Sequence, residues 1–164
     1  GSTVRQQDVR AKVHEIVQQV RGILRESRTV LPGQIDLEIS HHSGIERFHE
    51  FGIAMLTYVN RDYCKKLIIV LPGQKHPEQF HRVKEETFHL VWGDLQVALN
   101  GVERNCKPGD IVLVEREVRH AFTTKTGAVI EELSSTHQGN DSFYTDESIA
   151  KNKERKTFLT YWLD

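Results

Sequence analysis

The chain has 164 residues, of which 22 are Lys or Arg and 23 are Asp or Glu, so its formal charge is −1. One domain is the expected organisation, because single domains most often hold roughly 100–150 residues. The balanced charge gives no reason to expect nucleic acid or a membrane surface as the partner. We therefore expect a small or neutral substrate.

The cysteines and the opening residues bear on where the protein works. Cys64 and Cys106 lack the closely spaced Cys or His neighbours of a zinc knuckle, which favours a reducing, cytoplasmic location. No apolar run approaches the ~20 residues that a membrane helix requires. Gly1 and Ser2, with no initiating Met, predict the remnant of a removed tag. We therefore expect a domain taken from a longer polypeptide.

The first predicted element is an amphipathic helix from residue 3 to about residue 28. Its apolar residues recur at helical spacing: Val13, Ile16, Val17, Val20, Ile23 and Leu24. Pro32 and Gly33 end this segment, so residues 1–34 are predicted to form a helix and a linker. We expect the helix to pack against another part of the fold or to form a dimer interface.

Residues 35–134 contain short β-rich runs separated by turn residues at fairly even intervals. Asn100 and Gly101 are the strongest hairpin signal, because a type I′ turn needs two residues that tolerate positive φ. Such a series predicts an all-β fold of antiparallel strands that closes into a barrel or jelly roll. Residues 135–164 are polar, although Phe158, Thr160 and Trp162 alternate and predict a last edge strand.

Two sets of residues have the spacing of known sequence motifs. Four residues separate His81 from Glu86 and six separate Glu86 from Gly93, while His120 lies eleven positions after Gly109. Over roughly residues 67–132 the chain resembles the cupin family, whose two motifs have these intervals. The resemblance predicts a cupin barrel with a divalent metal held by His81, Glu86 and His120.

The match departs from the family at two places. Gln79 stands where the first motif has a His, and Glu115 and Glu117 replace the Pro and Gly of the second motif. The fourth ligand is open: Gln79 could coordinate through its amide oxygen, or His76 could swing in from the preceding turn. Mn²⁺ is the expected ion, with Fe²⁺, Zn²⁺, Ni²⁺ or Co²⁺ as alternatives. A metal-free barrel with merely hydrogen-bonded histidines is the other interpretation.

The segment after His120 suggests an acid or base. A hairpin with a three-residue loop at 125–127 would place His120 opposite Glu132, so that Glu132 points into the barrel and Glu131 points away. A two-residue loop would reverse that assignment. Glu132 is therefore the preferred general base, ahead of Glu131. Lys84 lies next to the ligands and could touch a substrate hydroxyl, or it could belong to a solvated strand entry.

The resemblance is closer over two stretches, LPGQKHPEQFHRVKEETFHLVWGDL and GAVIEELSSTHQGNDSFY. They resemble D-lyxose isomerase-like cupins and the cupin domains associated with sialic-acid-synthase-type enzymes. The resemblance implies metal-dependent interconversion of an aldose and a ketose through an enediolate, with Glu132 moving the proton. It also implies a sugar partner, a homodimer, no organic cofactor and fusion with a sugar-acid synthase.

Two further functions fit the same residues. A non-catalytic sugar-binding or regulatory domain is favoured by Gln79 at a ligand position. An Fe²⁺-dependent oxygenase is the third hypothesis, since an open face of two His and one carboxylate can activate O₂. The identity of the bound metal separates the three functions.

Overall fold

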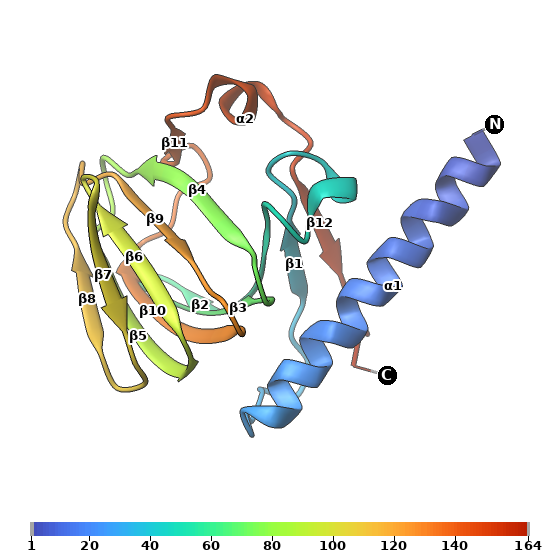
Figure 1. Ribbon diagram of the computed structural model, residues 1–164, viewed down its shortest axis with the longest axis horizontal. Coiled ribbons are helices and arrows are strands. Elements are labelled where there is room, and N and C mark those ends of the chain that lie inside the picture. Colours follow the sequence, from blue (N-terminus) through green and yellow to red (C-terminus); the bar gives the residue numbers. More distant parts are fainter. Residues whose placement is uncertain (1, 164) are drawn as a thin grey trace.

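A computed structural model describes residues 2–163, whose strands form two antiparallel sheets that face each other (Figure 1). The larger sheet contains β1 (Leu37–Ser40), β2 (Ile53–Asn60), β3 (Tyr63–Val70), β5 (Glu86–Gly93), β8 (Ile111–Val114), β10 (Ala128–Ser135) and β12 (Lys156–Leu159). The smaller sheet contains β4 (Lys75–Phe80), β6 (Leu95–Leu99), β7 (Val102–Cys106), β9 (His120–Thr123) and β11 (Phe143–Tyr144). Their orders are β12-β1-β2-β3-β10-β5-β8 and β11-β4-β9-β6-β7. The predicted all-β fold is confirmed.

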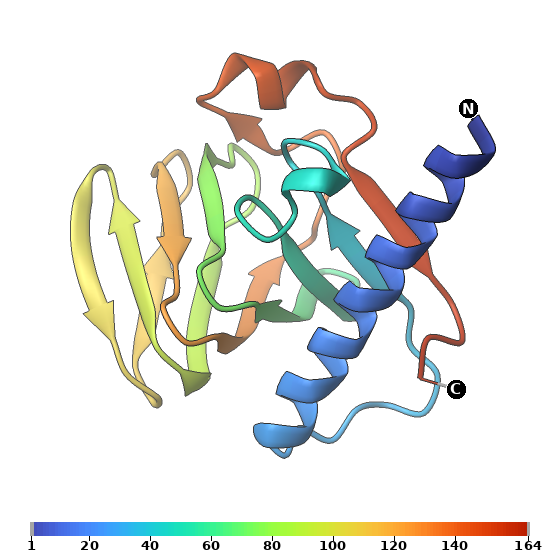
Figure 2. The same ribbon diagram turned by 45° about the vertical axis from the view of Figure 1, so that its right-hand side comes forward.

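The N-terminal helix α1 (Ser2–Glu26) crosses the outer face of the seven-stranded sheet (Figure 2). Its buried apolar residues are Ile16, Val17, Val20, Ile23 and Leu24. They form one core with Leu56 and Ile69 of the sheet and with Phe48, which follows the short helix η1 (Ile45–Arg47). The apolar stripe of α1 is therefore covered by its own chain. Within the described residues, no helix is both long and apolar enough to cross a membrane.

The central part of the seven-stranded sheet is buried on both faces, and side-chain alternation divides them. On β3, Leu67 and Ile69 face α1, whereas Ile68 and Val70 belong to a second core between the two sheets. Lys66 has the same parity as Ile68 and is only 4% exposed. Charged residues with this parity therefore enter the interior of the barrel.

The hairpin predicted over residues 120–132 is wrong. β9 lies in the five-stranded sheet and β10 in the seven-stranded sheet, so residues 124–127 carry the chain from one sheet to the other. His120 pairs with Gln79 of β4 and does not face Glu132. The crossing is held by the Asp94 carboxylate, which accepts hydrogen bonds of 2.9 Å from the backbone N–H groups of Lys125 and Thr126. The hairpin predicted at Asn100 and Gly101 is confirmed, with φ values of 48° and 82°.

The C-terminal segment contributes a strand to each sheet. β12 pairs with β1 at the edge of the larger sheet, and β11 pairs with β4 at the edge of the smaller one. Between them lies α2 (Glu147–Lys151), above the barrel opening in Figure 1. Trp162 donates a hydrogen bond of 2.8 Å from Nε1 to the Ile35 carbonyl. The predicted tag remnant begins at Gly1, which lies outside the described residues.

Gly93 allows a close backbone approach where β5 meets the sheet-crossing segment. Its φ is +92°, and a Cβ atom there would lie 1.9 Å from the Gly127 carbonyl oxygen. Gly73 has a similar φ of +83° with open space around it. We expect Gly73→Ala to cost about 1–2 kcal/mol, the penalty of the left-handed conformation. Gly93→Ala should cost at least about 2 kcal/mol more. Urea unfolding of both variants measures this, and equal losses would refute the close approach.

Candidate active site

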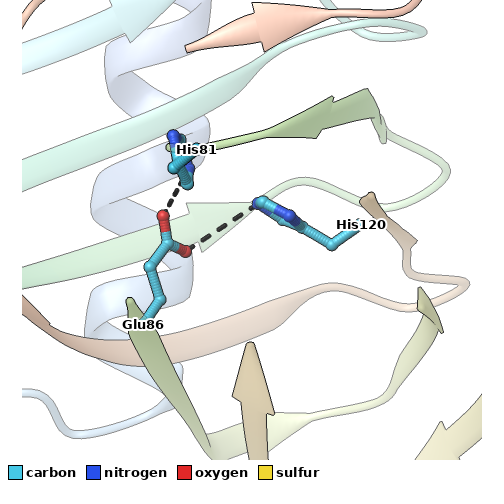
Figure 3. Close-up of side chains that lie close together, drawn as sticks. All are labelled: His81, Glu86 and His120. Carbon is cyan, nitrogen blue, oxygen red and sulfur yellow. Dashed lines mark ion pairs between the residues drawn. The ribbon is translucent and has the colours of Figure 1, made fainter. Parts of the chain in front are cut away.

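Three potential metal ligands converge at one end of the barrel (Figure 3). His81 directly follows β4, Glu86 begins β5, and His120 begins β9. The Nε2 atom of His81 lies 2.5 Å from Glu86 Oε1, and that of His120 lies 3.9 Å from Glu86 Oε2. All three side chains are buried. The cluster therefore joins a carboxylate from the larger sheet to two imidazoles from the smaller one.

Backbone carbonyl groups fix the tautomers of both imidazoles. His81 Nδ1 lies 2.6 Å from the Asp141 carbonyl oxygen, and His120 Nδ1 lies 3.0 Å from that of Val118. A carbonyl oxygen can only accept, so each Nδ1 carries a hydrogen. The Nε2 atom of each ring then faces Glu86. This arrangement is typical of metal-bound histidine, in which a second group orients the ring.

The unpaired atoms of the cluster fit a divalent cation. Within the part of the chain that the structure describes, these buried atoms have no hydrogen-bond partner: His81 Nε2, His120 Nε2, both Glu86 oxygens and Gln79 Oε1. Leaving such atoms unsatisfied costs several kcal/mol in total. The short contact between His81 and Glu86 requires a shared positive charge, either a proton or a metal ion. His, Glu and an amide oxygen suit a divalent transition metal.

Charge around Glu86 keeps this ligand ionised. Burial alone would raise the pKa of Glu86, but His81 and the Lys84 ammonium outweigh burial and hold the pKa well below its usual range. An ionised carboxylate is the form that binds a cation. The electrostatics of the cluster therefore agree with its geometry.

His76 lies beside Gln79, outside the cluster. Its Nδ1 donates to the Pro77 carbonyl at 2.9 Å, and its Nε2 lies 3.3 Å from Gln79 Nε2. Burial lowers the pKa of His76 to about 3, so the ring is neutral and its Nε2 accepts from the Gln79 amide. This hydrogen bond identifies the Gln79 Oε1 atom as the free one. The ring of His76 also stacks on Phe122, with 4.9 Å between centroids.

The structure places Glu132 and Glu131 on opposite faces of β10. Glu132 is 5% exposed and lines the same cavity as His81 and Glu86. Burial, followed by the charge of Glu86, raises the pKa of Glu132 to about 7. Glu131 lies on the outer face, 3.2 Å from Lys65 Nζ and 2.9 Å from His89 Nδ1. Only Glu132 can therefore reach a molecule bound in the cavity.

Lys84 connects the carboxylates of the cavity. Its Nζ lies 3.2 Å from Glu86 Oε1, 3.8 Å from Glu132 Oε2 and 3.1 Å from His137 Nδ1. Burial would lower the pKa of Lys84, but Glu132 and Glu86 outweigh it and raise the pKa. The side chain is buried, so the solvated strand entry considered for Lys84 is wrong. The Asn60 side-chain amide holds His137 in place: it accepts a hydrogen bond of 2.9 Å from the His137 N–H and donates one of 3.1 Å to the His137 carbonyl.

Asp141 organises the segment that carries His81 and Lys84. Its carboxylate accepts backbone hydrogen bonds of 2.9 Å from Arg82, 3.0 Å from Val83 and 3.0 Å from Lys84. Its carbonyl oxygen also accepts from His81. Sequence reasoning missed this residue, because it lies in an unpatterned polar segment far along the chain from its partners. Asp141 therefore orients both a potential ligand and the cavity lysine.

Comparison with known proteins identifies the class of domain. The sequence model of the cupin domain family matches residues 66–135. This range contains the three-residue cluster, all of β10 with Glu132, and the part of β3 that begins at Lys66. The chain therefore carries a cupin domain, as its motif spacing predicts.

The resemblance to cupin sugar isomerases is also confirmed. The chain is 25% identical over 176 residues to D-lyxose/D-mannose isomerase of Thermosediminibacter oceani, covering 88% of this chain and 97% of that protein. It is 25% identical over 140 residues to D-lyxose ketol-isomerase of a Thermofilum species, covering 68% and 78%. L-ribose isomerase of Cellulomonas parahominis has the same fold, with a TM-score of 0.72, 16% identity and coverage of 87% and 94%.

Removing the Asp141 side chain should weaken metal binding. We expect Asp141→Ala to lower Mn²⁺ affinity about 10–100-fold, because the lost carboxylate fixes the backbone next to His81 and thereby the carbonyl that orients this ring. Titration calorimetry on the metal-free protein measures the change. Asp146→Ala is the matched control, since Asp146 only caps α2 through Ser148. Unchanged affinity in Asp141→Ala would show that the cluster needs no such support.

The raised pKa of Glu132 makes metal-free stability depend on pH. Because the folded pKa of about 7 exceeds the model-peptide value of 4.5, the protonated group stabilises the fold at low pH. We expect the free energy of unfolding, relative to Glu132→Gln, to fall as pH rises from about 4.5 to 7. His89 and Lys65 outweigh burial and lower the pKa of Glu131, so the free energy of unfolding relative to Glu131→Gln should rise with pH, and only below about pH 4.5. Parallel slopes in the two comparisons would contradict this electrostatic assignment.

Proposed function

We propose that this cupin domain is a metal-dependent aldose–ketose isomerase. The observation that carries the proposal is the position of Glu132, a buried carboxylate with a pKa near 7, in one cavity with His81 and Glu86. A pKa near the working pH suits a group that both takes and returns a proton. The isomerase names of the sequence relatives support the same reaction class.

The ligand set in this proposal is His81, Glu86, His120 and the amide oxygen of Gln79. Gln79 is preferred over His76, because its Oε1 is buried without a partner while His76 Nε2 accepts from the Gln79 amide. Mn²⁺ is the proposed ion, since an amide oxygen and a carboxylate favour harder metals. When bound, such an ion polarises the substrate carbonyl and its neighbouring hydroxyl as a Lewis acid.

The chain's own residues provide the proton transfer. In the proposed reaction, Glu132 removes the proton from the carbon next to the carbonyl and returns it to the former carbonyl carbon. The Lys84 ammonium, 3.8 Å from Glu132, gives a proton to the carbonyl oxygen as the enediol forms, and it takes one back from the neighbouring hydroxyl as that group becomes the new carbonyl. Both groups are buried, so their charges act in a medium that screens them weakly. The reaction requires no organic cofactor.

A non-catalytic sugar-binding domain is the second candidate, and Gln79 at a ligand position favours it. Metal analysis of the purified protein separates the candidates. Manganese supports the isomerase, absence of metal supports the binding domain, and iron supports the oxygenase considered from the sequence. The homodimer, the cytoplasmic location and fusion to a sugar-acid synthase stay predictions. The helical surface on which the dimer was expected is already packed within the chain.

Two neighbouring glutamates provide the test of the proposed base. With Mn²⁺ added, we expect ketose formation from D-lyxose or D-mannose to fall at least about 10³-fold in Glu132→Gln, since the general base is removed. Glu131→Gln should retain activity, because Glu131 lies on the outer face with Lys65 and His89. Chromatographic assay of the ketose measures both rates.

His120→Ala should lose Mn²⁺ binding and turnover together, whereas Glu132→Gln should lose turnover and keep the metal. Metal content measured on the same samples separates these effects. Equal turnover in the wild type and Glu132→Gln would overturn the mechanism.

A further inference from the structure

The cavity continues along the concave face of the seven-stranded sheet, away from Glu86. Starting at β5, the neighbouring strands are β10, β3, β2, β1 and β12. Glu132 lies on β10, Lys66 on β3 and Lys156 on β12, and all three side chains line the cavity. Ser40, His42, Ser142 and Tyr144 line the cavity as well. The cavity thus has an end with the metal cluster and an end with two lysines.

Among the described residues, Lys66 is a buried lysine that forms no ion pair. It is 4% exposed and is the register partner of Glu132. Of the cavity lysines, Lys84 pairs with Glu86, and Lys156 lies 3.7 Å from Glu38. No ion pair within residues 2–163 includes Lys66. Burial lowers the pKa of Lys66 because burying its charge is costly, and the charge of Glu132 offsets this cost only in part. A bound anion would remove that cost.

Further polar atoms at this end also lack partners. Among the described residues, Arg155 Nε and His42 Nδ1 are buried with no hydrogen-bond partner. The Arg155 guanidinium lies 4.9 Å over the Tyr144 ring, and the His42 ring lies 5.5 Å from the same ring. Tyr144 lines the cavity, so it connects these two groups to the lysines. Arg155, His42 and Lys156 therefore bring positive charge and free nitrogen atoms to the side of the cavity formed by Tyr144 and β12.

We propose that the substrate is an anionic sugar, whose phosphate or carboxylate binds Lys66 and Lys156 while its carbonyl end lies beside Glu132. This proposal rests on the isomerase function proposed above and specifies its substrate class. Lys66 on β3 and Glu86 on β5 are two strand spacings apart, roughly 10 Å, and only β10 with Glu132 lies between these strands. The expectation of a neutral substrate came from the net charge of the whole chain, which does not determine the local field.

Three forms of one sugar test the proposal. D-mannose, D-mannose 6-phosphate and D-mannuronate share their stereochemistry from C2 to C5 and differ in the group at C6. With the Mn²⁺-loaded protein, titration calorimetry should give at least about tenfold tighter binding for a charged form than for D-mannose. The charged form with the larger preference identifies the anion as phosphate or carboxylate. The preference should shrink as salt is added.

Adjacent lysines on opposite faces of β3 provide matched variants. Lys66→Met should reduce the ratio of the affinity for the charged form to the affinity for D-mannose to about one. Lys156→Met should reduce this ratio in part. Lys65→Met should leave the ratio unchanged, because Lys65 lies on the outer face beside Glu131. Thermal unfolding of each variant confirms that it is folded. If Lys66→Met does not fold, Lys156→Met carries the test alone.

The results separate this proposal from the isomerase function. If D-mannose is isomerised and neither charged form binds more tightly, the anionic substrate is refuted and the isomerase stands. If a charged form binds more tightly through Lys66 and no form is isomerised, the anion site stands and the isomerase fails. An equal preference in the wild type and Lys66→Met would also refute the site.

Discussion

The contact of the buried Glu86 carboxylate with the imidazoles of His81 and His120 is the interaction on which the site depends. Glu86 belongs to the seven-stranded sheet, whereas His120 belongs to the five-stranded sheet, so the contact joins both sheets at one end of the barrel. Carboxylate oxygens and imidazole lone pairs can be buried together only around positive charge. The carbonyl groups of Asp141 and Val118, which orient the two rings, and the Lys84 ammonium complete this arrangement.

The cluster could be predicted from the sequence because motif spacing fixes residues on short strands whose side chains alternate. The predicted hairpin between β9 and β10 is wrong, but the inward orientation of Glu132 does not depend on it. Side chains alternate along β10, and Glu132 points to the same face as the buried Ile130. The departure at Glu117 has a local explanation. This residue has φ 69°, a left-handed conformation that favours glycine, and its N–H donates to the His81 carbonyl at 2.7 Å. The turn survives without glycine because that hydrogen bond remains.

Other parts of the site could not be predicted, for physical reasons. Asp141 and Tyr144 lie in a segment without periodicity. Asp141 is placed by hydrogen bonds with residues that lie 57 to 60 positions earlier in the chain. Tyr144 is placed by β11, a strand of only two residues. Lys65 and Lys66 are adjacent on β3, and the residues that follow them, 67–70, are all apolar. A strand buried on both sides has no alternating pattern, so nothing local distinguishes the outward lysine from the inward one. Only the packing of α1 on one face separates them.

The two faces of the seven-stranded sheet therefore have different tasks. The outer face forms an apolar layer with α1, in which Val20 and Leu56 are fully buried. The inner face carries charged groups that are costly to bury and that select the bound molecule. The layer beneath α1 shares no side chain with the cavity. It can therefore stabilise the fold while cavity residues are exchanged during evolution. Such a division makes the architecture durable and the chemistry changeable, because a new specificity need not be invented together with a new scaffold.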